Sequence, residues 1–269
     1  MSRRWTVHLA LLFGGIIMIT PFVWQIVVSL QTVTESMRTP PQFWPSWQWH
    51  NFVDIFQTVP LGRQFLNTVV VTIAVTAGQL LLCSLAAFAF ARLEFPGRGL
   101  IFTLFLTVLM VPGELFLLPR YEIMQGLGWL NTLQALAAPG IFGAFGVFLL
   151  RQFFLSLPKE LDEAARLDGA NPIQIYWYIM LPLVKPGLLA LGLLTVMWSW
   201  SSLLWPLVVN TDPEMMTLSA GLASLRGQYL TNFPILFAGS IVASLPVIVL
   251  FVVMQRQLIA GIAFTGSKG

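Results

Sequence analysis

The sequence predicts an all-α integral membrane protein with six transmembrane helices. Hydrophobic residues make up 57% of the 269 residues and charged residues only 9%, whereas a soluble domain carries about a quarter charged residues. Six apolar stretches approach the roughly 20 residues that a membrane-spanning helix needs, namely 7–30, 66–90, 100–118, 133–150, 188–209 and 235–254. Segments of alternating apolar and polar residues, which an outer-membrane barrel would require, are absent from the sequence.

The composition excludes several other classes of protein. The single cysteine, Cys83, rules out an internal disulfide and a zinc site of the multi-cysteine kind. The two histidines, His8 and His50, are far apart in the sequence, and the net charge of +3 includes no basic run of the kind that binds nucleic acid. The sequence also lacks a G-x-x-x-x-G-K-[ST] phosphate-binding loop and any recognisable catalytic pair, so neither ATP hydrolysis nor a membrane enzyme is supported.

The distribution of Lys and Arg predicts the orientation, because cytoplasmic loops of membrane proteins are enriched in both. With the N-terminus in the cytoplasm, four basic residues fall in the outer segments, namely Arg38, Arg63, Arg120 and Arg226. Ten then fall in the inner segments: Arg3, Arg4, Arg92, Arg98, Arg151, Lys159, Arg166, Lys185, Arg256 and Lys268. We therefore expect both termini in the cytoplasm.

The N-terminal part is expected to be an uncleaved anchor followed by an external segment. The apolar run after Arg4 continues to Leu30 without a small-residue cleavage site. Three tryptophans at 44, 47 and 49 predict a loop at the lipid headgroup level, followed by a short interfacial helix over 51–56. We divide the chain into 1–64, with the first span and this segment, and 65–269, with the other five spans and a cytoplasmic C-terminal tail.

The third apolar stretch contains an unusual acidic residue. Val111-Pro112-Gly113 should bend or unwind the helix there. Glu114 is the only acid inside any of the six stretches, and an ionisable residue within a span is by default a candidate functional residue. The alternative is that Glu114 satisfies backbone groups that the break sets free.

The fifth stretch is rich in tryptophan and serine. Trp198, Trp200, Ser201 and Ser202 are candidates for the translocation path, since indole rings can cover sugar rings and hydroxyls can bond to solute hydroxyls. The alternative is that the rings pack between helices and that the serines allow close helix contact.

The longest polar interruption in the second half of the chain is 157–182. Pro158 and the helix-forming residues of 159–168 predict a short helix. Gly169 suits a left-handed C-terminal cap. Asn171-Pro172 then predicts the start of a second helix that ends near Pro182. An ordinary helical surface loop is the alternative interpretation.

The residues of this interruption also resemble the EAA loop of ABC importer permeases. Seven positions match the pattern E-A-A, three residues, G, nine residues, I-x-L-P, namely Glu163, Ala164, Ala165, Gly169, Ile179, Leu181 and Pro182. Arg166 and Asp168 lie within the same loop. The resemblance implies the type I ABC importer permease fold, in which this loop is the coupling helix that docks on a cytoplasmic ATPase. A passive channel would have no need of such a helix.

The remainder of the chain resembles the carbohydrate-uptake permeases within that family. The C-terminal Gln255-Arg256 to Gly269 is similar to their Q-R-x-x-x-x-G pattern, whereas Ser201 and Ser202 replace the polar pair of W-N-D/E-x-L-W-P. The substrate contacts of those relatives therefore do not transfer to these two serines. The resemblance implies a mono- or oligosaccharide as solute. Glycerol 3-phosphate or a glycerophosphodiester is the alternative, although no Lys or Arg lies in the middle of a span, which favours a neutral solute.

The resemblance also implies a set of partners in a bacterial or archaeal cytoplasmic membrane. These are a second, different permease subunit, two ATPase subunits and an external solute-binding protein. No cofactor is expected in this chain, because ATP and Mg would be bound by the ATPase subunits.

Overall fold

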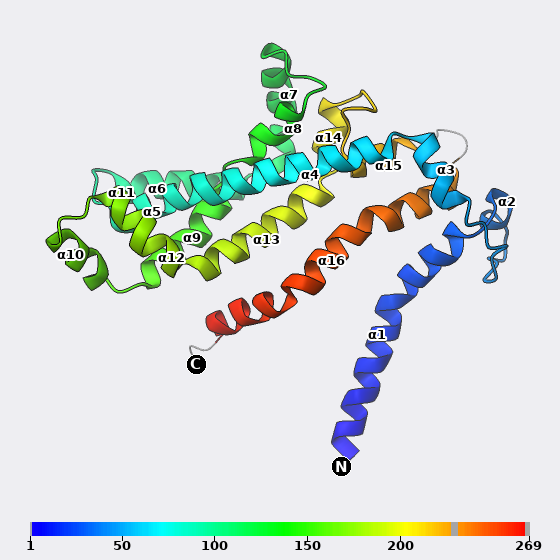
Figure 1. Cartoon of the computed structure of the whole chain (residues 1–269), viewed down its shortest axis with the longest axis horizontal. Helices are drawn as coiled ribbons and strands as arrows, with labels where there is room; N and C mark the ends of the chain where they lie inside the picture. The colour runs from blue at the N-terminus through cyan, green and yellow to red at the C-terminus, as the bar shows by residue number, and fades with distance from the viewer. Residues whose placement is uncertain (1, 227–230, 267–269) are drawn as a thin grey trace.

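The computed structural model describes residues 2–226 and 231–266, and within these ranges the chain is helical and contains no β-strand. The predicted all-α class is therefore confirmed. The longer helices run roughly along the molecule, with α10 at the far left end and α2 and α3 at the right end (Figure 1). The expected C-terminal tail reaches residues 267–269, which lie outside the described residues.

The first helix, α1 (Ser2–Ser29), packs against the last, α16 (Phe233–Gly266). Helix α1 diverges from the remaining helices toward its N-terminal end (Figure 1). The expected division between 1–64 and 65–269 falls inside α4 (Leu61–Gly78). Helices α1, α2 and α3, which precede the division, all contact α16, which follows it. The division stays a prediction.

The external segment folds back on the end of α1. It contains α2 (Val33–Ser36) and α3 (Asn51–Thr58), and α3 lies where the short helix is expected. The side-chain amide of Asn51 donates to the carbonyl oxygens of Ser29 and Gln31, both at 2.9 Å. Tryptophans 44, 47 and 49 remain exposed, as a loop at the headgroup level requires.

The second predicted span is a continuous helix over Leu61–Arg92. It consists of α4, a π-helical turn (Gln79–Cys83) and α5 (Ser84–Arg92). The neighbouring helix α9 (Ala144–Ser156) approaches the π-helical turn closely at Gly146. A Cβ atom at Gly146 would lie 2.7 Å from Gln79 Oε1 and 3.0 Å from Cys83 Sγ, so only glycine fits there.

The third apolar stretch is broken at Val111-Pro112, where the sequence predicts a bend or unwinding. Helix α6 (Arg98–Thr107) continues as a 3-10 turn to Met110. The chain then turns by 97° into a second 3-10 turn (Gly113–Phe116) and α7 (Leu117–Gly126). Pro112 has no N–H to continue the helix and forces the preceding Val111 into an extended conformation.

The fourth stretch is also bent, and the fifth follows a bend and is itself interrupted. Helix α8 (Leu133–Ala137) continues as a 3-10 turn to Gly140 and meets α9 at 43°. Beyond α10 (Glu160–Leu167), the helical segment 172–183 meets α13 (Lys185–Ser201) at 77°. This segment comprises α11 (Pro172–Gln174), a π-helical turn (Ile175–Met180) and α12 (Leu181–Leu183). The expected span over 188–209 is interrupted, because Ser202 is extended and separates α13 from α14 (Leu204–Val209).

Six apolar helical segments thus follow one another in the predicted order. Among the described residues, two helices are long and apolar enough to cross a membrane alone, and the three bent pairs are further candidates. Phe233–Val249 is a shorter apolar helix within α16. The number of six spans stays a prediction. The short helix α15 (Leu218–Ser224) lies between α14 and α16.

The largest buried cluster joins α5, α9 and the π-helical turn of 175–180. The Phe88 ring lies 5.8 Å from that of Phe154 and 5.4 Å from that of Tyr176, measured between centroids. The hydroxyls of Tyr176 and Ser84 are 2.7 Å apart and share a hydrogen bond. The largest buried cluster therefore lies beside the polar loop, and α10 and the following helix pack against it.

Candidate functional site

Helix α10 presents one face to the protein and one to solvent. The predicted range was 159–168, and the structure places the helix at Glu160–Leu167. Asp162 and Ala165 are buried, whereas Glu163, Ala164, Arg166 and Leu167 are exposed. Leu167 is 89% exposed in this chain. A single exposed apolar residue is normal on a protein surface, so this face is notable because it carries Glu163 and Ala164 of the matched pattern.

The turn after α10 has the predicted cap. Gly169 has φ +84°, which is the left-handed region. The Gly169 N–H donates to the carbonyl of Arg166 at 3.0 Å, and the Ala170 N–H donates to that of Ala165 at 2.9 Å. These two bonds form a Schellman cap and fix the direction in which the chain leaves the helix.

The second helix begins at the predicted N-cap. The Asn171 side-chain oxygen accepts from the Gln174 N–H at 2.9 Å, and the Gln174 side-chain oxygen accepts from the Asn171 N–H at 2.8 Å. This reciprocal pair is a capping box. Pro172 occupies the first helical turn, where its missing N–H has no cost. Both ends of the turn between the two helices are therefore fixed.

A buried arginine anchors the start of α10. Arg92, at the end of α5, donates to Asp162 Oδ2 at 2.9 Å, with 5% and 12% of the two side chains exposed. The same guanidinium donates to the carbonyl of Leu157 at 2.7 Å and to that of Phe154. Arg92 therefore joins three elements: α5, the C-terminal end of α9 and α10. Sequence reasoning used Arg92 only for orientation, since nothing in its spacing pointed to Asp162.

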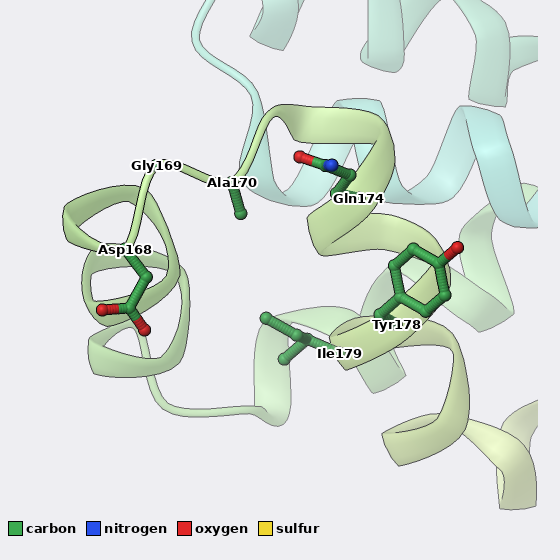
Figure 2. A pocket seen from close by; sticks show the side chains of 6 residues that line it. All are labelled: Asp168, Gly169, Ala170, Gln174, Tyr178 and Ile179. Carbon is green, nitrogen blue, oxygen red and sulfur yellow. The ribbon is translucent and has the colours of Figure 1, made fainter.

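A cavity of about 310 Å³ separates α10 from the helix that follows it. Its lining includes Gly169 and Ile179 of the matched pattern, together with Asp168, Ala170, Gln174 and Tyr178. Figure 2 shows Ala170 and Ile179 on opposite sides of this gap, with the Asp168 carboxylate on the α10 side. Of the remaining matched residues, Leu181 packs against the main core and Pro182 is exposed.

A second cavity, of about 250 Å³, lies where α4, α7, α13 and α14 meet. Two of the predicted path residues, Trp198 and Ser202, line it, and so do Ser199 and Thr195. These four positions follow i, i+3, i+4 and i+7, which places them on one face of the helix and could have identified the set from sequence. Arg120 of α7 also lines this cavity.

The other predicted path residues lie elsewhere. Trp200 donates its indole N–H to the Ala243 carbonyl at 3.2 Å and packs against Phe65. The Ser201 hydroxyl donates to the Met197 carbonyl at 2.6 Å. Trp200 therefore contacts another helix, whereas the exposed Ser201 hydroxyl bonds within its own helix, and the assignment of both residues to the translocation path stays a prediction.

Glu114 lies beyond the 97° bend, in the 3-10 turn, and its side chain is exposed. The helix before the bend ends at Met110, so Glu114 does not lie in the middle of a continuous helix. Its assignment to the translocation path stays a prediction.

Broken apolar helices with a polar helix held at one end indicate a multi-pass membrane protein. The family described as "Binding-protein-dependent transport system inner membrane component" matches residues 1–263, so the chain belongs to that family. It is a multi-pass permease subunit of an ABC importer and not an enzyme.

Three relatives illustrate the family. The chain is 39% identical to the arabinooligosaccharides transport system permease protein AraQ of Halalkalibacterium halodurans, over 98% of this chain and 96% of the relative. It is 31% identical to the diacetylchitobiose uptake system permease protein NgcG of Streptomyces coelicolor, over 95% and 86%. It is 33% identical to the sn-glycerol-3-phosphate transport system permease protein UgpE of Yersinia pestis, over 95% and 94%.

A solved structure shows the same fold. It is that of a bacterial ABC transporter involved in the import of the acidic polysaccharide alginate, with a TM-score of 0.80 and 20% identity. The likeness covers 95% of this chain and 96% of that chain. At this identity the comparison supports the fold and nothing about the solute.

Proposed function

We propose that this chain is one of two different permease subunits in an ATP-driven importer for a sugar delivered by an external solute-binding protein. Two ATPase subunits bind ATP and Mg and complete the complex. Both termini lie in the cytoplasm, on the side of α10. The observation that carries the proposal is the exposed face of α10, which bears the matched residues at the tip of a rigidly anchored loop.

The geometry of the loop suits the transmission of force. A partner that moves α10 also moves α5 and the end of α9, because Arg92 belongs to α5 and bonds to the other two elements. The capped turn at Gly169 passes the same displacement to the segment 172–183 and then to α13. Glu163 offers a carboxylate for a charge-assisted hydrogen bond to a basic group of the ATPase, and Ala164 allows the partner surface to come close.

The solute is proposed from the relatives. Two of the three relatives above are named for oligosaccharide uptake, and the third for sn-glycerol 3-phosphate. Sugar is therefore the first candidate. Glycerol 3-phosphate or a glycerophosphodiester is the second, and it is favoured by Arg120, which lines the cavity beside Trp198.

Affinity purification of this chain from native membranes tests the proposed assembly. We expect one copy of this chain, one different permease and two ATPase chains for each complex. ATP-dependent uptake into vesicles, with the binding protein supplied, would then be required for an importer. An active complex with two copies of this chain and no second permease would contradict the heteromeric arrangement.

A further inference from the structure

The cavity between α4, α7, α13 and α14 combines a positive charge with polar groups and contains no acidic residue in its lining. Arg120 provides the charge. Four hydroxyl side chains line the same cavity, namely Thr195, Ser199, Ser202 and Thr217. The groups come from helices far apart in the sequence, which meet beside α4 (Figure 1). The cavity therefore collects hydrogen-bond donors around one cation.

Two of these groups lack a partner within the part of the chain that the structure describes. Arg120 lies over the Phe116 ring, 5.8 Å from its centroid, and forms no ion pair there, since Arg92–Asp162 is the one found among the described residues. Thr217 is 3% exposed, and its hydroxyl has no hydrogen-bond partner there. A buried hydroxyl normally has a hydrogen-bond partner, and Arg120, which is partly buried, presents a positive charge to a group that enters the cavity. A bound group with negatively charged oxygens would satisfy both.

The aromatic lining suits a ring or a short carbon chain. Trp205 is fixed by its indole N–H, which donates to the Ala135 carbonyl at 3.0 Å. Trp198 packs edge-on against Phe145, with 5.3 Å between centroids, and remains 55% exposed. Indole surface covers the C–H groups of polyhydroxylated molecules. The volume of about 250 Å³ is smaller than the roughly 300–1,000 Å³ of pockets for drug-sized ligands, so the cavity fits one small unit.

We propose that this cavity is a subsite for a polyhydroxylated unit that carries an anionic group, such as a sugar acid or a polyol phosphate. Arg120 would bind the anionic group, and the hydroxyls and the indoles would hold the remainder. The inference rests on the proposed function, because it names the chemical class of the transported solute. The sequence favours a neutral solute, because no Lys or Arg lies in the middle of a span. Arg120 lies outside the spans but lines this cavity, so the expected solute is revised to an anionic one.

Equilibrium binding to the purified complex in lipid nanodiscs, without nucleotide, tests the subsite. The probes are glucuronate, glycerol 3-phosphate and glucose. We expect at least one anionic probe to bind about tenfold tighter than glucose, since charge-assisted hydrogen bonds are roughly twice as strong as neutral ones. Tight binding of glucuronate alone would indicate that the solute is a sugar acid. Tight binding of glycerol 3-phosphate alone would indicate a polyol phosphate.

Substitutions assign the effect to the cavity. Arg120→Gln should weaken binding of the anionic probe at least about tenfold and leave glucose binding within about twofold. Arg120→Lys, which keeps the charge, should lose less. Arg63→Gln is the matched control, because Arg63 is exposed and does not line the cavity. Gel filtration of each variant confirms that the complex is assembled before binding is measured.

Three results would overturn the subsite. The wild-type protein could bind glucose as tightly as the anionic probes, or it could bind none of the three probes. The third is equal affinity of the wild type and Arg120→Gln for the anionic probes. ATP-dependent uptake is measured separately on the same preparations. Failure of uptake with intact anion binding would count against the proposed importer and not against the subsite. Normal uptake with no effect of Arg120→Gln on binding would count against the subsite alone.

Discussion

Arg92 Nη1 and Asp162 Oδ2 lie 2.9 Å apart in a buried ion pair that links α5 to α10. The pair connects a membrane helix to the helix proposed to contact the ATPase. Nη2 of Arg92 donates to the carbonyls of Phe154 and Leu157 at the end of α9, where helices have unsatisfied acceptors. Arg92 therefore bonds to the end of α9 and to α10, the two elements on either side of the connection between them.

The first prediction is that Arg92→Gln destabilises the loop and the protein. Removing one partner of a buried pair costs about 3–5 kcal/mol, because the other charge is left buried and unpaired. The midpoint of thermal unfolding of the purified complex should fall clearly. Arg98→Gln is the control, since Arg98 donates only to the neighbouring Leu93 carbonyl among the described residues. Equal midpoints for the two variants would contradict the anchoring role of Arg92.

The second prediction concerns the backbone at Gly169. A Cβ there would meet no atom within 4 Å, so the penalty of a side chain comes from φ +84° alone. Gly169→Val should cost about 1–2 kcal/mol and tilt α10, whereas Gly169→Asn should cost less, since Asn tolerates the left-handed region. Affinity for the ATPase subunits, measured by co-purification, should fall in the order wild type, Asn, Val. If Gly169→Val and wild type have the same affinity for the ATPase subunits, the left-handed cap is not needed for their association.

The third prediction concerns the packing of α9 against the π-helical turn. A Cβ at Gly146 would lie 2.7 Å from Gln79 Oε1, so Gly146→Ala should destabilise the protein by about 1–3 kcal/mol through overpacking. A Cβ at Gly62 would meet nothing within 4 Å. Gly62→Ala should therefore leave the unfolding midpoint unchanged or raise it slightly. A similar loss for both variants would refute the close approach at Gly146.

The fourth prediction separates docking from folding at Leu167. This side chain is 89% exposed in the isolated chain, so Leu167→Ser should change stability by no more than about 0.5 kcal/mol. In the assembled importer the same side chain is expected to contact the ATPase. Co-purification of the ATPase should weaken while the unfolding midpoint of the free permease stays constant. Undiminished ATPase association would exclude Leu167 from the interface.

Local sequence signals predict the helices and turn of residues 157–182 but not the bond that anchors them. Pro158, Gly169 and Asn171-Pro172 are local signals, and the structure has a helix, a left-handed cap and an N-cap at these positions. The bond between Arg92 and Asp162 joins residues 70 positions apart, and no local pattern encodes such a pairing.

The lining of the second cavity could be predicted in part. The i, i+3, i+4 and i+7 spacing groups Trp198 and Ser202 with Thr195 and Ser199 and separates them from Trp200 and Ser201. Arg120 was assigned to a loop by its place in the sequence, and the 97° bend after Met110 brings α7 beside α13 and α14. Pro112 predicted a bend, but a bend of that size depends on tertiary packing.

The ratio of solute taken up to ATP hydrolysed, in vesicles reconstituted with the whole importer, tests most directly whether α10 transmits the action of the ATPase. Glu163→Lys is compared with Glu94→Lys, which reverses an exposed acid at the same end of the molecule. We expect Glu163→Lys to lower the ratio at least about tenfold, because a like charge replaces a charge-assisted hydrogen bond, while Glu94→Lys stays near wild type. With subunit stoichiometry unchanged, a normal ratio for Glu163→Lys would contradict the coupling role of this helix.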